Sequence, residues 1–284
     1  MKSHDVAPYW GLRARVDPGT DVALRASIFA NRMPQRAFYF GRTAAALHEL
    51  PMPVRFAQET NLHVGVPSGD RRVEALGVIP HHVRIEPVDI VSHRSLRVTS
   101  VARTWCDLAA SGLTLAELVA AGDRAIWHRA PQTTAARLLE CVHRYESRRG
   151  ALKMRMAFDL LSDAADSAPE SEVRVAIVTA GFPPPLVNAE IRLRSGETMH
   201  PDLSWPQFKV AIDYEGDHHR VERDQWNRDI RRFRLFNDET WRIYRATADD
   251  YRAPHKVLLW LARTLPAPSE PIAAKVHPFA GRQA

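Results

Sequence analysis

Residues 201–219 read PDLSWPQFKVAIDYEGDHH, and this stretch decides the fold of the second half of the chain. Its alternation of apolar and polar residues predicts strands at 200–205 and 209–215, joined by a tight turn. If that turn closes a hairpin, Asp202 lies directly opposite Asp213 on the neighbouring strand. The sequence therefore predicts that two acids 11 positions apart meet across one sheet.

A third acid joins this pair, because alternate residues of a strand share a face. Asp213 and Glu215 then point the same way, roughly 6–7 Å apart, beside Asp202. Three carboxylates this close repel one another, and a bound divalent cation such as Mg²⁺ removes that cost. The alternative is a surface strand with solvated acids. The residues that face the other way, toward a core, are Val210, Ile212 and Tyr214.

The same residues carry a family resemblance. Pro201-Asp202 followed by Asp213-Tyr214-Glu215 resembles the PD-(D/E)XK nuclease motif. Residues 210–219 are similar to bacterial endonuclease-like domains related to the very-short-patch-repair endonuclease, and the resemblance spans about 165–265. Further matching segments are Pro169–Arg174, Gly181-Phe-Pro-x-Pro185, Asp229-x-x-Arg232 and Trp241–Arg245.

This resemblance implies a role for each acid. Asp202 corresponds to the metal-binding aspartate and Asp213 to the second acid, with Mg²⁺ or Mn²⁺ as the cofactor. Glu215 stands where the motif has lysine, which leaves the general base open. His219 aligns with a histidine of the relatives that serves as proton donor or acceptor, and His218 is the adjacent alternative. A solvated His219 is the other interpretation.

Glu170 is a further candidate, because an acid from the first helix often joins the metal site in this fold. Ser167-Ala-Pro-Glu170 also has the form of a helix capping box, with Pro169 inside the first turn. Both roles therefore stay open for Glu170.

A basic helix is predicted over 220–237, directly after the acidic strand. Its apolar residues recur at helical spacing and form one buried stripe, and its arginines lie mostly off that stripe. Such arginines either hold DNA phosphates or form a solvated face. The candidate nucleic-acid-binding residues are Arg220, Arg223, Arg228 and Arg231.

The order of elements predicts the fold class. Three short strands, a helical crossover and a fourth strand form a mixed sheet with helices on its faces. This is a restriction-endonuclease-like α/β arrangement inside a chain that is α+β overall. The expected elements are helix 169–180, strands 189–194, 200–205 and 209–215, helix 220–237, strand 240–245 and helix 248–265. The expected domains are 1–162 and 163–266, followed by a disordered tail at 267–284.

The first domain is predicted to be α+β and resembles the body of AbiEi-type antitoxins over about 40–130. Those proteins usually begin with a DNA-binding winged helix-turn-helix, and residues 1–40 show no convincing one. Arg103, Asp107 and Asp123 are interpreted as structural residues that hold helices together. The expected elements are helix 42–50, strands 62–66 and 83–90, and helices 99–110, 114–128, 134–145 and one from 150.

Composition agrees with a DNA-binding cytoplasmic protein. The formal net charge of +6 favours polyanionic partners. There is no apolar run of 18 residues, which argues against a membrane span, and no signal-peptide pattern at the N-terminus. Cys106 and Cys141 lack metal-site spacing and are expected to be reduced.

These patterns together predict a magnesium-dependent endodeoxyribonuclease, a hydrolase that cuts phosphodiester bonds in DNA repair or defence. The alternative is a non-catalytic nucleic-acid-binding or toxin–antitoxin regulatory protein that keeps the nuclease scaffold. A third option is a nuclease component that works only with a protein partner of a defence or repair complex.

Overall fold

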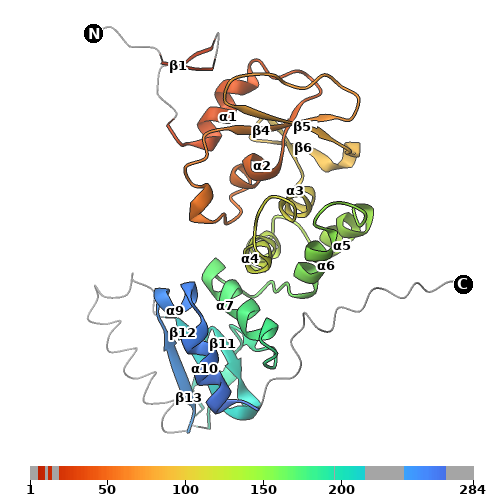
Figure 1. Ribbon diagram of the computed structural model, residues 1–284. Coiled ribbons are helices and arrows are strands. Elements are labelled where there is room, and N and C mark those ends of the chain that lie inside the picture. The colour runs from red at the N-terminus through yellow and green to blue at the C-terminus, as the bar shows by residue number, and fades with distance from the viewer. Residues whose placement is uncertain (1–5, 10–11, 15–18, 195, 215–239, 267–284) are drawn as a thin grey trace, which may run out of the picture. The chain divides into compact units, whose positions relative to one another are not determined.

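The computed structural model describes residues 6–9, 12–14, 19–194, 196–214 and 240–266. The chain is an α+β protein that divides into two compact units, residues 1–161 and 162–284 (Figure 1). This division falls one residue before the expected domain boundary. The predicted tail at 267–284 lies outside the described residues.

The N-terminal unit is built on a mixed five-stranded sheet with the order β5-β4-β3-β7-β6. The pairs β3–β7 and β4–β5 are parallel, and the pairs β3–β4 and β6–β7 are antiparallel. The five strands are β3 (Phe38–Tyr39), β4 (Leu62–Pro67), β5 (Val78–Val83), β6 (Ile90–His93) and β7 (Leu96–Thr99). A separate antiparallel pair consists of β1 (Val6–Tyr9) and β2 (Leu12–Ala14).

One predicted strand of this unit was wrong. Instead of a strand over 83–90, β5 ends at Val83, a short 3₁₀ turn covers Pro87–Asp89, and β6 begins at Ile90. Pro80 made β5 hard to recognise, because proline cannot donate to a sheet ladder. The strand tolerates Pro80 because β5 is at the edge of the sheet.

Six helices complete the described part of this unit (Figure 1). Five of them were predicted, and α1 was not. Asp21 begins α1 by accepting a hydrogen bond from the Leu24 amide at 2.9 Å, and Thr114 begins α4 with a capping box to Glu117. The helices are α1 (Val22–Ala30), α2 (Gly41–Leu47), α3 (Val101–Leu108), α4 (Leu115–Ile126), α5 (Ala135–Arg144) and α6 (Ala151–Asp159).

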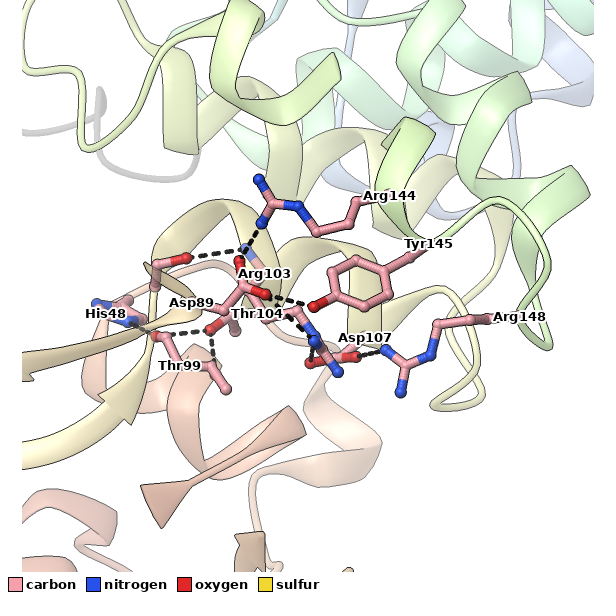
Figure 2. Close-up of polar contacts among 10 residues, drawn as sticks. His48, Asp89, Thr99, Arg103, Thr104, Asp107, Arg144, Tyr145 and Arg148 are labelled. Carbon is pink, nitrogen blue, oxygen red and sulfur yellow. Dashed lines mark hydrogen bonds and ion pairs between the residues drawn. The ribbon is translucent and has the colours of Figure 1, made fainter. Parts of the chain in front are cut away.

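A buried ionic network joins α3 to the end of α5 (Figure 2). Arg103 is fully buried, and its Nε donates to Asp107 Oδ2 at 2.8 Å. Arg148 Nη1 donates to the other oxygen of Asp107 at 2.9 Å. Asp89 accepts from Arg144 at 2.7 Å and from the Tyr145 hydroxyl. These contacts agree with the structural role predicted for Arg103 and Asp107.

The C-terminal unit contains a four-stranded mixed sheet with the order β13-β12-β11-β8. Strands β8, β11 and β12 pair antiparallel, whereas β12 and β13 are parallel. A parallel pair needs a crossover connection, and the predicted helix 220–237 falls in that connection, outside the described residues. The strands are β8 (Leu186–Val187), β11 (Leu203–Trp205), β12 (Val210–Tyr214) and β13 (Arg242–Ala246).

Helices of this unit pack on one face of its sheet. Val173 and Ile177 of α7 (Ala168–Thr179) share a core with Ile212 of β12 and Leu261 of α10 (His255–Thr264). The expected inward face of β12 is confirmed, since Val210, Ile212 and Tyr214 all contact this core. No helix in the described part of the chain is both long and apolar enough to cross a membrane.

Three element predictions in this unit need correction. The strand expected at 189–194 is only β9 (Ile191–Arg192), which pairs with β10 (Thr198–Met199) in a separate ribbon, and β8 takes its place in the sheet. The strand expected at 200–205 begins at Leu203. The helix expected at 248–265 is interrupted, because Pro254 follows α9 (Ala248–Arg252) and disfavours helical geometry at the preceding residue.

Candidate active site

The hairpin β11–β12 has the predicted register. Its pairs are Leu203 with Ile212, Ser204 with Ala211 and Trp205 with Val210. The turn Pro206–Phe208 closes it, with Lys209 in the left-handed region at φ 51°. Continued by one pair, this register sets Asp202 opposite Asp213.

Asp202 is tied to the other strand by its side chain as well. Its Oδ2 accepts a hydrogen bond from the Tyr214 amide at 2.6 Å. Asp202 and Asp213 are both partly buried, so their carboxylates are neither sealed in the core nor fully solvated. Asp202, which directly precedes β11, and Asp213 of β12 are thus both at the end of the hairpin that is opposite its turn.

Glu170 lies near the start of α7 and is nearly fully buried. Its Oε1 accepts from the Ser167 hydroxyl at 2.8 Å, and its Oε2 accepts from the Asp166 amide at 3.1 Å. Ser167 caps α7 by accepting from the Glu170 amide at 3.4 Å, but the Glu170 carboxylate takes the Asp166 amide where a capping box uses the Ser167 amide. A further bond to Oε2 comes from the Asn188 side chain at 3.1 Å, so Glu170 also contacts a different part of the unit.

Asn188 links Glu170 to the β11–β12 hairpin, and no sequence pattern predicts this link. Its side-chain amide donates to Glu170 and also to the Ala164 carbonyl at 2.8 Å. Its own backbone amide donates to the Asp202 carbonyl at 2.9 Å. Asn188 has a positive φ of 46°, which asparagine tolerates better than most residues. It therefore fixes the start of α7 against the strand that carries Asp202.

Tyr251 of α9 is the second residue that sequence reasoning missed. Only 6% of it is exposed, and its hydroxyl has no hydrogen-bond partner among the described residues. Burial raises the pKa of this phenol well above its usual value, and the negative charges of Asp202, Glu170 and Asp213 raise it further. Its ring also meets the Tyr214 ring edge-on, with centroids 4.5 Å apart. All three described acids therefore act on one buried hydroxyl.

The remaining predicted site residues lie outside the described part of the chain. These are Glu215, His219, Arg220, Arg223, Arg228 and Arg231. Within the described residues, no group of three or more acidic, histidine or cysteine side chains is arranged to hold a metal ion. Asp202 and Asp213 supply two carboxylates, which is the usual number for Mg²⁺ when water and substrate phosphate complete its shell.

Comparisons with known proteins leave the family open. No family model matches the chain, and no solved structure matches it. Two uncharacterized proteins of Mycobacterium tuberculosis are each 27% identical over 138 residues: MT2308 of strain CDC 1551 / Oshkosh and Rv2248 of strain ATCC 25618 / H37Rv. The matched region covers 48% of this chain and 51% of each relative, so it spans about half of their length.

Proposed function

We propose that this protein is a metal-dependent DNA endonuclease whose active site lies in its C-terminal unit. The observation that carries the proposal is the hairpin register, which pairs Leu203 with Ile212 and, extended by one pair, would set Asp202 opposite Asp213. Glu170 and Tyr251 support it, because a second acid-bearing element and a buried hydroxyl converge on the same end of the sheet.

Each residue has a proposed task. Asp202 and Asp213 offer oxygen ligands to Mg²⁺ or Mn²⁺, together with Glu215. The bound ion supplies polarisation of the phosphodiester and a water of lowered pKa. Asn188 holds Glu170 and the Asp202 backbone in place.

Other groups of the proposed site transfer protons and bind the substrate. Tyr251 presents a protonated hydroxyl beside the acids, and its raised pKa keeps the proton on the phenol even in alkaline solution. We assign proton transfer to His219 and phosphate contact to the four arginines Arg220, Arg223, Arg228 and Arg231. The same proposal places the protein in the cytoplasm, with DNA as its substrate.

A second candidate function rests on Glu215, which replaces the lysine of the motif that the sequence resembles. A scaffold without that lysine suits a protein that binds nucleic acid without cutting it. In that case the antitoxin-like N-terminal unit implies a role, with a protein partner, in a toxin–antitoxin or defence system.

Cleavage of supercoiled plasmid and of single-stranded DNA in Mg²⁺ or Mn²⁺ separates the two candidates. Asp202→Asn is the sharpest variant, because its amide oxygen can still accept from the Tyr214 amide while the charge is lost. Asp249→Asn is the matched control, since Asp249 is an exposed acid paired with Arg252. We expect cutting by the wild type and the control only. DNA binding without cutting by any of the proteins would favour the second candidate.

A further inference from the structure

A polar pocket of about 500 Å³ lies within the N-terminal unit, apart from the acidic hairpin. Its size falls within the range of small-molecule sites. Arg148 and Arg149 line it together with His63 and His81, while Phe40 and Met154 add apolar surface. Asp107 lines it as well, but its two oxygens already accept from Arg103 and Arg148. The pocket therefore combines positive charge, hydrogen-bonding groups and an aromatic ring.

A chain of hydrogen bonds leads into this pocket. Arg42 donates to both oxygens of Glu59, at 2.6 and 2.7 Å. Glu59 Oε1 lies 3.1 Å from His63 Nε2, and His63 Nδ1 lies 2.9 Å from His81 Nε2. Residues from α2, β4 and β5 are thereby joined in one line that ends on the ring of His81.

The acceptor and donor chemistry of these hydrogen-bonded groups fixes which atoms carry protons. An ionised carboxylate only accepts, so Glu59 requires a proton on His63 Nε2. Neutral His63 then accepts at Nδ1, so the proton between the two rings belongs to His81 Nε2. Burial is the main reason that the pKa of both histidines is lowered, that of His81 to about 4, so both rings are neutral at pH 7.

His81 consequently presents a lone pair at Nδ1. Among the described residues, the hydrogen bond of the His81 ring is the one through Nε2 to His63, which leaves Nδ1 for a ligand. A ligand hydroxyl is the natural donor to such an acceptor. The ring is further held by Phe40, whose ring centroid lies 4.9 Å away. The hydrogen bonds that begin at Arg42 thus fix the orientation of the His81 ring and the direction in which its Nδ1 accepts a hydrogen bond.

Arg148 and Arg149 supply positive charge that complements an anionic ligand. Among the residues that the structure describes, Arg148 donates to Asp107 through Nη1, so the other N–H groups of its guanidinium can serve a ligand. Arg149 is exposed, and no ion pair is recorded for it within the described part of the chain. Two guanidinium groups match the charge and the several oxygens of a phosphate better than a single carboxylate.

We propose that this pocket binds a small molecule that carries a phosphate group. Arg148 and Arg149 pair with the phosphate, and His81 accepts from a hydroxyl of the same ligand. Phe40 and Met154 cover the apolar part of the ligand. The site is independent of the proposed nuclease centre, so either assignment stands or falls without the other.

Calorimetric titration of the full chain in phosphate-free buffer tests the site. The probes are inorganic phosphate, adenosine 5′-monophosphate, adenosine and a 5′-phosphorylated oligonucleotide too large for the pocket. We expect the monophosphate to bind more tightly than adenosine, and inorganic phosphate to compete with it. Arg149→Ala is expected to weaken binding at least about tenfold, as for loss of one charge-assisted hydrogen bond, and His81→Gln about fivefold, as for loss of one hydrogen bond between neutral groups.

Arg84→Ala is the matched control, because Arg84 is an exposed arginine outside the pocket. It is expected to leave binding unchanged. Absence of binding by inorganic phosphate and by adenosine 5′-monophosphate would overturn the proposal. So would equal affinity for adenosine, binding of the oligonucleotide alone, or an Arg149→Ala protein that binds like the wild type. Arg149 is exposed, so its variant stays informative even if His81→Gln does not fold.

Discussion

Replacing Arg103 by methionine tests whether the buried ionic network stabilises the N-terminal unit. Arg103 is fully buried, donates to Asp107 at 2.8 Å and lies 3.5 Å from Asp89. Its guanidinium also stacks 4.0 Å from the centre of the Tyr145 ring. Methionine keeps the length and apolar volume of the side chain but removes the charge and every donor.

The expected loss of unfolding free energy depends on which partners the two acids keep after the substitution. Breaking a buried ion pair by removing one partner costs about 3–5 kcal/mol, because the other charge is left without compensation. Here Asp107 keeps Arg148 at 2.9 Å, and Asp89 keeps Arg144 at 2.7 Å. Neither acid is therefore left alone, and we expect a loss at the lower end, about 3 kcal/mol.

Urea unfolding followed by circular dichroism measures this loss. The control is Arg94→Met, because Arg94 and Glu49 form an ion pair whose side chains are 59% and 62% exposed. Such a surface pair contributes about 0–1 kcal/mol. If Arg103→Met lowered the unfolding free energy no more than Arg94→Met does, the assigned structural role of the network would be wrong.

Three further predictions concern single residues. Gly122→Ala in α4 should lower the unfolding free energy by about 1–3 kcal/mol, because its added Cβ would lie 2.4 Å from Leu161 Cδ2 and 2.7 Å from Trp105 Nε1; wild-type stability in urea would contradict this. Tyr251→Phe should leave stability unchanged or raise it by up to about 1 kcal/mol, since the buried hydroxyl it removes has no hydrogen bond among the described residues; a clear loss would show that the hydroxyl is satisfied. The lowered pKa of His81, about 4 against an ordinary 6.5, means that the unfolded chain binds the proton more readily. This contribution to stability is full above pH 6.5 and is lost as the pH falls toward 4. After allowance for solvent, the loss is about 2 kcal/mol of unfolding free energy. His81→Gln should remove this part of the pH dependence, which urea unfolding at a series of pH values measures.

The hairpin could be predicted from sequence because its determinants are local. The apolar alternation of Val210, Ile212 and Tyr214 defines the buried face, and a turn of fixed length then sets the register. Asp202 and Asp213 follow directly from that register. The same logic failed at 189–194: residues AEIRLR alternate regularly, yet only Ile191–Arg192 forms a strand, and its partner β10 lies outside the four-stranded sheet.

Asn188 and Tyr251 could not be predicted, because their roles depend on packing between distant segments. Asn188 contacts Glu170, 18 positions earlier, through a positive-φ turn that no composition pattern marks. Tyr251 meets the acids from α9, a short helix that ends before Pro254, whereas the sequence pattern predicts one continuous helix over 248–265. The histidine chain was missed for a similar reason, since Pro80 hid the edge strand that brings His81 to His63.

The central claim is that Asp202 and Asp213 form a divalent-cation site, and Mn²⁺ binding followed by electron paramagnetic resonance tests it most directly. Titrations of the wild type, Asp202→Asn, Asp213→Asn and the exposed control Asp249→Asn are compared at equal protein concentration. We predict that the wild type and the control deplete the free Mn²⁺ signal equally, and that each hairpin variant binds at least about tenfold more weakly, as for loss of a charged ligand. Equal Mn²⁺ binding by all four proteins, or none by the wild type, would contradict the account.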